Sequence, residues 1–143
     1  MPPANSNATV GYSGKPLWQK LGLKPGLRVA LAAVPDDYWT LCGCDPVALE
    51  LASPRGRVDF AHGFARTRAQ LQTLLATLSR RLEPAGALWI SWPKKSVGVA
   101  TELSEDVLRE LALPLGLVDV KVCAVDATWS GLKFVWRKSE RRA

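Results

Sequence analysis

The sequence is poor in the residues that build metal and redox sites, because its 143 residues include one histidine and three cysteines. Cys42 and Cys44 form a C-x-C pair rather than C-x-x-C, and the odd number of cysteines gives no disulfide framework. We therefore expect inert or buried thiols and no metal site. His62, in the segment DFAHGFA, has no recognisable nucleophile to serve, so it is predicted to be a structurally satisfied histidine at a strand end.

Long apolar segments are also absent, since no run approaches the roughly 18–20 residues of a membrane span. The first residues, MPPANSNATVGYSG, have neither the basic region nor the apolar stretch of a secretory signal. These absences predict a cytoplasmic protein without a membrane partner. With 48% hydrophobic and 22% charged residues, a chain of this length has the composition of one folded domain.

The net charge of +6 lies at the two ends of the chain. Residues 1–26 contribute +3 and residues 133–143 contribute +4, whereas residues 27–132 carry a net −1. A basic tail such as WRKSERRA more often serves solubility than specific recognition, although it also permits weak, salt-sensitive binding to a polyanion. We expect a flexible tail at 1–10, a single domain at 11–138 and a basic tail at 139–143.

Local patterns predict alternating strands and helices. The clearest helix is capped by Thr67 and carries leucines at the helical period from Leu71 to Leu82. Ser104 caps a second helix, which runs to Leu113. A short helix is expected within 14–23 and another at 36–41, with Asp36 and Asp37 in its first turn. Strands are expected at 27–34, 46–52, 58–64, 87–92, 117–125 and 132–136.

Strand–helix units in succession predict a mostly parallel sheet, and the turn DATWSG joins its last two strands as antiparallel neighbours. We therefore predict an α/β, Rossmann-like three-layer α/β/α sandwich with about six strands that ends in an antiparallel hairpin. Relative to a seven-stranded sheet of this type, one strand–helix unit is missing between Leu51 and Val58.

Two resemblances rest on particular segments. VDFAHGFARTRAQLQTLLATLSRRLEPAGALWISWPKK resembles the middle of class I S-adenosylmethionine methyltransferases. GYSGKPLWQKLGLKPGLRVAL, WISWPKKSVGVATELSEDVLRE and GLVDVKVCAVDATWSGLKFVWR are similar to the bacterial domain of unknown function 3052 family, over about residues 11–137. That resemblance implies a shortened methyltransferase-like fold, and it implies no established activity or catalytic residues.

The loop after the first strand lacks the residues that hold a methyltransferase cofactor. Such a loop runs Asp/Glu-x-Gly-x-Gly-x-Gly, and here Leu31 takes the acidic position while Ala33, Pro35 and Asp37 replace the glycines. Proline also fixes φ and removes an N–H. Glu50 follows this loop by 17 residues, close to the spacing of a ribose-binding acid, and it is the one cofactor-binding candidate. We expect no cofactor, with S-adenosylmethionine as the alternative.

Two other segments are candidate binding sites for a small anion or a partner. Lys94, Lys95 and Ser96 follow a strand end, where open parallel sheets bind ligands. A solvated lysine pair is the structural alternative. Asp126, Thr128 and Trp129 lie in the hairpin turn, where they either stabilise the turn and pack on the domain or contact a partner. No catalytic residue and no metal ligand is assigned.

Three functions follow from these observations. The first is a non-catalytic, methyltransferase-like module that binds a partner protein or a small anionic ligand. The second is an S-adenosylmethionine-dependent transferase with an altered cofactor pocket. The third is a nucleic-acid-associated protein that uses the basic termini and Lys94-Lys95, which requires these groups to lie on one face. The missing glycines favour the first.

Overall fold

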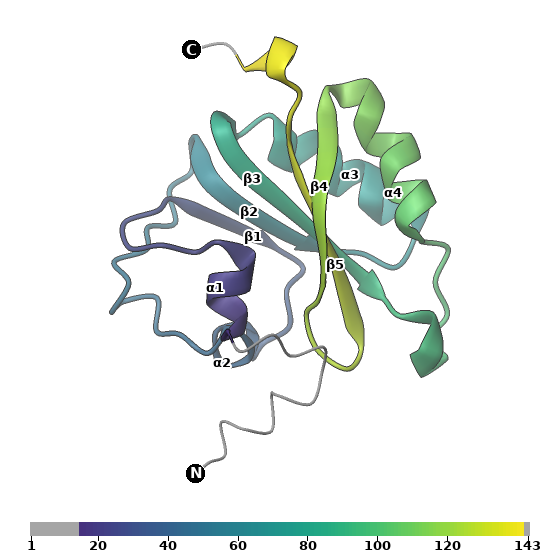
Figure 1. Ribbon diagram of the computed structural model, residues 1–143, viewed down its shortest axis with the longest axis horizontal. Helices are drawn as coiled ribbons and strands as arrows, with labels where there is room; N and C mark the ends of the chain where they lie inside the picture. Colours follow the sequence, from purple (N-terminus) through teal and green to yellow (C-terminus); the bar gives the residue numbers. More distant parts are fainter. Residues whose placement is uncertain (1–14, 142–143) are drawn as a thin grey trace.

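The computed structural model describes residues 15–141, so the expected tail at 1–10 lies outside the described residues. One mixed sheet contains β1 (Val29–Ala32), β2 (Val58–Phe64), β3 (Leu82–Pro93), β4 (Leu117–Ala124) and β5 (Trp129–Trp136). The strand order is β1-β2-β3-β5-β4, with β1, β2 and β3 parallel and β5 antiparallel to both of its neighbours. The predicted parallel sheet with a terminal hairpin is therefore confirmed (Figure 1).

Helices pack on both faces of this sheet. Leu88 and Ile90 of β3 point into a cluster with α3 (Arg68–Ser79) and α4 (Glu105–Ala112). Trp89, between them, points into a second cluster with α1 (Leu17–Leu21) and α2 (Tyr38–Cys42). Successive strand residues face opposite sides, so both faces of the central strand β3 are buried against helices. Short 3₁₀ turns follow at Lys95–Val97, Leu113–Leu115 and Lys138–Glu140.

The two predicted helix caps are confirmed. Thr67 accepts a hydrogen bond from the Gln70 backbone N–H, and the Gln70 side chain accepts from the Thr67 backbone in return. Ser104 accepts from the Val107 N–H at the start of α4, where Glu105 and Asp106 occupy the first turn. These local hydrogen bonds satisfy N–H groups that a helix start leaves unpaired, which is why the sequence signal was reliable.

The expected strand at 46–52 is wrong. Its backbone forms consecutive turns, Leu49 to Asp45 and Leu51 to Pro46, and only Ala52 makes a bridge to Arg28. The sheet therefore has five strands rather than about six. The expected helix at 36–41 is shifted to Tyr38–Cys42, so Asp36 and Asp37 precede it instead of occupying its first turn.

Strand β3 is longer than predicted because it begins at Leu82, within the segment read as the helix end. Its register against β2 shifts between Val58 and Phe60, which pair with Leu82 and Ala87. Residues 83–86 of β3 therefore form a bulge opposite a single residue of β2, Asp59. Gly86 lies in this bulge, and a Cβ at that position would lie 2.7 Å from a Leu82 methyl and 3.1 Å from the Asp59 carbonyl oxygen. The bulge accommodates the Pro84–Gly86 segment that normally interrupts a strand.

Candidate functional site

The carboxyl ends of the three parallel strands meet at one edge, where β1 ends at Ala32, β2 at Phe64 and β3 at Pro93. Open α/β sheets bind their ligands at this edge. The segments that follow the strands are Ala33–Asp37, Ala65–Thr67 and Lys94–Ser104. Of the site residues predicted from the sequence, these segments contain Lys94, Lys95 and Ser96.

Ala33, the first residue after β1, adopts a left-handed backbone with φ +57°. An L-residue with a Cβ rarely takes this conformation, which glycine adopts at no steric cost. Ala33 stands at the first glycine position of a methyltransferase loop, so the backbone keeps the turn although the glycine is absent. Leu31, at the acidic position, packs against the apolar cluster beneath α1 and α2 instead of presenting a carboxylate.

A pocket of about 390 Å³ lies beside this turn. It is lined by Ala33 and Phe64 at the strand ends and by the exposed side of α3, with a mainly apolar surface formed by Ala33, Phe64, Ala69, Gln70, Thr73 and Leu74. We call it the Ala33–Phe64 pocket. Its volume falls within the roughly 300–1,000 Å³ of small-molecule sites. Sequence periodicity could not reveal it, because it depends on how α3 crosses the ends of β1 and β2.

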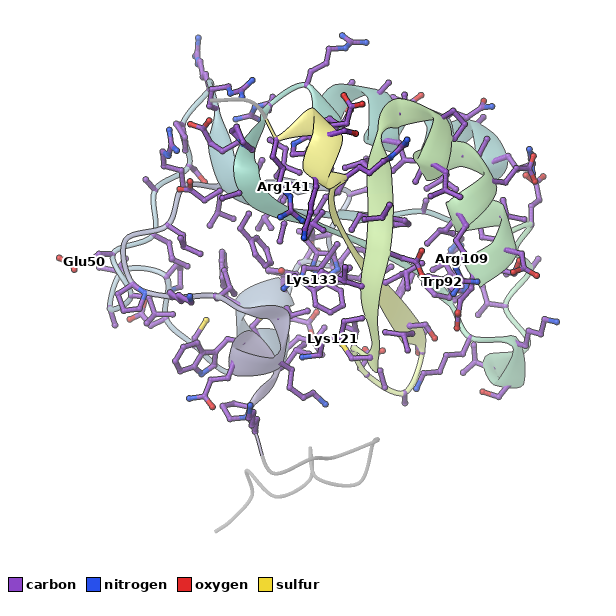
Figure 2. All side chains as sticks on the ribbon, turned by 45° about the horizontal axis from the view of Figure 1, so that its top comes forward. Glu50, Trp92, Arg109, Lys121, Lys133 and Arg141 are labelled. Atoms are coloured by element: carbon purple, nitrogen blue, oxygen red, sulfur yellow. The ribbon has the colours of Figure 1, made fainter. Side chains whose placement is uncertain are left out.

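Glu50 lies at the opposite edge of the sheet. Leu49 accepts a hydrogen bond from the Gly26 N–H, and Ala52 pairs with Arg28, so this segment runs beside the residues that precede β1. The Glu50 side chain is exposed and projects away from the domain (Figure 2). The structure therefore does not bring Glu50 together with the loop at Ala33, and it does not place a ribose-binding carboxylate there.

A second depression of about 410 Å³ surrounds the predicted lysine pair. Lys94 and Lys95 line it together with Trp92, Ser130 and the start of α4, whereas Ser96 is exposed and outside it. Arg109 also lines it but is held by Glu105, Asp106 and Asp119 at 2.7–3.2 Å. These hydrogen bonds raise the pKa of Arg109. Lys94 and Lys95 form no salt bridge within residues 15–141, so they are the cations that a ligand could meet.

The hairpin turn lies directly against the lysine segment, because the Lys94 N–H donates to the Thr128 carbonyl at 2.8 Å. The Asp126 carboxylate accepts from the backbone N–H groups of Thr128 and Trp129 and thereby fixes the turn. Trp129 begins β5 and packs edge-on against Phe64, with the ring centroids 4.9 Å apart. The two predicted segments are therefore neighbours, and Trp129 packs on its own domain rather than projecting from a loop tip.

His62 is fully buried and both of its ring nitrogens are hydrogen-bonded. Nδ1 lies 2.8 Å from the Tyr38 hydroxyl and Nε2 lies 2.8 Å from the Ser91 hydroxyl, with Phe64 stacked on the ring. Burial lowers the pKa of His62 to about 3, so the imidazole is neutral at physiological pH. The hydrogen bonds between Tyr38 and His62 and between His62 and Ser91 connect α2, β2 and β3 inside the domain. His62 therefore has the structural role predicted from the sequence.

The three cysteines form no disulfide. Burial raises the pKa of Cys42 to about 12 and also raises the pKa values of Cys44 and Cys123, which makes the thiols poor nucleophiles. Within residues 15–141, no three His, Cys, Asp or Glu side chains come together as metal ligands, and no helix is long and apolar enough to cross a membrane.

The lysine pair Lys94-Lys95 lies apart from the described basic residues at the C-terminal end. Lys94 and Lys95 follow the carboxyl end of β3, whereas Arg137 donates its N–H to Gly116, which precedes β4 at the other edge. The described part of the C-terminal tail therefore lies away from the lysine pair. Lys94 and Lys95 therefore do not share a surface with Arg137, and nucleic-acid binding stays a prediction.

No family model matches the sequence, and no curated protein matches it. Solved structures do match. The chain is similar to the ribosomal protein L11 methylase from Lactobacillus delbrueckii subsp. bulgaricus (TM-score 0.56, 13% identity, 83% of this chain and 74% of that chain). It is also similar to a SAM-dependent methyltransferase from Aquifex aeolicus (TM-score 0.54, 17% identity, 81% and 85%) and to DhpI in complex with SAH (TM-score 0.53, 12% identity, 77% and 76%). These likenesses show a methyltransferase-like α/β fold.

Proposed function

We propose that this chain binds S-adenosylmethionine, or its product S-adenosylhomocysteine, in the Ala33–Phe64 pocket and acts as a transferase with an altered cofactor site. The observation that carries the proposal is this apolar pocket at the carboxyl ends of β1 and β2, in a fold whose solved neighbours include SAM-dependent methyltransferases. The comparisons favour this function over the non-catalytic module that the missing glycines first suggested.

The residues at the pocket fit one part of this cofactor and not another. The left-handed turn at Ala33 allows close approach of a ligand to the backbone, and the apolar wall from Phe64 to Leu74 suits an adenine ring. Asp36 and Asp37 are exposed on the same loop, where a carboxylate can meet an amine. The ribose side lacks its acid, because Glu50 lies at the other edge. S-adenosylmethionine supplies an electrophilic methyl group when bound.

The test is a thermal-shift titration with S-adenosylhomocysteine, supported by calorimetry. A ligand at about 100 times its Kd adds about 2.7 kcal/mol, so we expect a saturable rise of several degrees in the Tm of the wild-type protein. Ala69→Trp places an indole in the pocket from an exposed position on α3 and should remove the rise. Gln72→Trp, also exposed on α3 but outside the pocket lining, should retain it. An unchanged wild-type Tm at 1 mM ligand would contradict the proposal.

A second candidate function is a non-catalytic binding module for a small anionic ligand. The observation that favours it is the pair Lys94 and Lys95, which form no salt bridge within residues 15–141 and line a depression next to the fixed turn at Asp126. Membership of the domain of unknown function 3052 family, proposed from the sequence motifs, is compatible with either function. A cytoplasmic location, also proposed from the sequence, is compatible with either function too.

The second function predicts a different pattern in the same assay. S-adenosylhomocysteine would leave the Tm unchanged, while a carboxylate or phosphate ligand would raise it. Lys94→Gln and Lys95→Gln together should remove most of that rise, because they delete the two lining cations that form no salt bridge within residues 15–141. Ala69→Trp would have no effect on it. The two functions are distinguished by which variant loses the rise in Tm with which ligand.

A further inference from the structure

A cluster of lysines lies on the α1 side of the hairpin, apart from both depressions at the carboxyl edge. Lys121 of β4 and Lys133 of β5 are directly opposite each other in the antiparallel register. On its other side, Lys133 is opposite Trp89 of β3, which is buried beneath α1. Figure 2 shows both lysines between α1 and β4. Neither lysine lines either depression at the carboxyl edge.

The ends of α1 and β1 hold this arrangement together. Lys121 Nζ donates to the Lys20 carbonyl at the C-terminal end of α1, where unpaired carbonyls favour a cation. Lys24 lies in the turn between α1 and β1, just after the Lys20 and Leu21 carbonyls that accept hydrogen bonds from Lys121 and from Trp89, the residue opposite Lys133. Partial burial lowers the pKa of Lys133, and the charges of Lys121 and Lys24 lower it further.

The described residues supply no carboxylate to this cluster. None of Lys24, Lys121 and Lys133 takes part in a salt bridge within residues 15–141, where every described ion pair uses an arginine. Like charges directly opposite each other on neighbouring strands destabilise a sheet. The fold therefore places two lysine side chains at opposite positions on one face of the hairpin, and an anion bound by both would relieve their repulsion.

We propose that Lys24, Lys121 and Lys133 form a binding site for a phosphate group, distinct from the carboxyl-edge pockets. A phosphate is compact, carries up to two charges and accepts several hydrogen bonds, which matches three flexible ammonium donors. The phosphate can belong to a small polyphosphate or to the backbone of a nucleic acid. The lysines recognise the same group in both cases.

The experiment measures binding of pyrophosphate and of a 12-nucleotide single-stranded RNA by calorimetry at 50 and 200 mM NaCl. The double variant Lys121→Gln/Lys133→Gln is expected to lose at least about tenfold in affinity for the probe that binds. Arg55→Gln removes an exposed charge from a loop at the amino edge and serves as the control that retains binding. For RNA, the slope of log K against log salt should fall by about 1.4 when two contacts are lost.

Each outcome decides the proposal. Lysine-dependent binding of pyrophosphate identifies a small phosphate ligand, and lysine-dependent binding of RNA alone identifies a nucleic-acid backbone. In the absence of ligand, an unchanged circular dichroism spectrum shows that the double variant is folded, because the removed repulsion offsets the lost hydrogen bond from Lys121 to the Lys20 carbonyl. If neither probe binds at 1 mM, or if the control loses as much affinity as the double variant, the proposal is wrong.

Discussion

Lowering the pH from 6.5 to 4.5 is expected to reduce the free energy of unfolding by about 2 kcal/mol through one residue, His62. The folded state holds the pKa of His62 at about 3, whereas an unfolded histidine titrates near 6.5. Between these values the unfolded chain binds a proton that the folded chain does not, so stability falls as the pH falls, by about 1.4 kcal/mol per unit. The loss begins as the pH falls below about 7.5 and is complete only near pH 3.

The sequence makes this measurement unusually clean, because His62 is its only histidine. Arginine hydrogen bonds lower the pKa values of Asp59, Glu83 and Glu110, so these carboxylates affect stability mainly below about pH 4.5. Urea unfolding at pH 7.0, 5.5 and 4.5 gives the slope.

Two variants separate titration of the ring from loss of its hydrogen bonds. His62→Gln should flatten the pH dependence between 6.5 and 4.5. Ser91→Ala removes one hydroxyl partner but keeps the imidazole, so it should lower stability by about 1–3 kcal/mol and preserve the slope. A wild-type stability that is constant between pH 7.0 and 4.5 would show that the buried imidazole accepts a proton without penalty.

Trp89→Ala is expected to destabilise the protein by about 3–5 kcal/mol, the range for removing a large buried aromatic side chain. Trp89 is fully buried between β3 and the helices α1 and α2. Its indole Nε1 donates to the Leu21 carbonyl at 2.8 Å, so the substitution also leaves a carbonyl at the end of α1 without its donor. Both effects act on the attachment of α1 to the sheet.

Urea unfolding followed by circular dichroism measures this loss. Trp39→Ala is a matched control, because Trp39 is only half-buried at the edge of the same cluster and should lose clearly less stability. Trp89→Phe keeps much of the volume and deletes the hydrogen bond, so its loss should lie between those of the two alanine variants. A loss below about 1 kcal/mol for Trp89→Ala would contradict the packing described for α1.

Local chemistry explains which elements were predictable from the sequence. The caps at Thr67 and Ser104 and the leucine stripe of α3 act over one or two helical turns, and each was found where expected. The prediction of a strand at 46–52 was wrong. Its apolar residues resemble a strand, but a strand needs a partner to pair with, and only Ala52 has one, in Arg28. The predicted start of β3 was five residues late, because Leu82 continues the spacing of the leucines in α3 and was assigned to that helix.

The candidate site was predictable only in part, because its geometry depends on contacts between distant segments. Strand order placed Lys94 at the carboxyl edge, and that part follows from sequence alone. The contact between Lys94 and Thr128 depends on the register of β5 against β3. The left-handed turn at Ala33 could not be predicted, because the sequence has no glycine there. Glu50 has the spacing of a ribose-binding acid, but no strand precedes it that would place it at the carboxyl ends of the sheet.

The hydrogen bonds at the end of α1 have a consequence for synthesis of the protein. The carbonyls of Lys20 and Leu21 receive their side-chain donors from Lys121 and Trp89, which lie 101 and 68 residues further along the chain. During translation, α1 leaves the ribosome long before either donor exists. Its five residues are too few to remain helical alone. The N-terminal segment should therefore dock late, after the hairpin has formed, and nascent chains that end before β4 should remain open to proteases there.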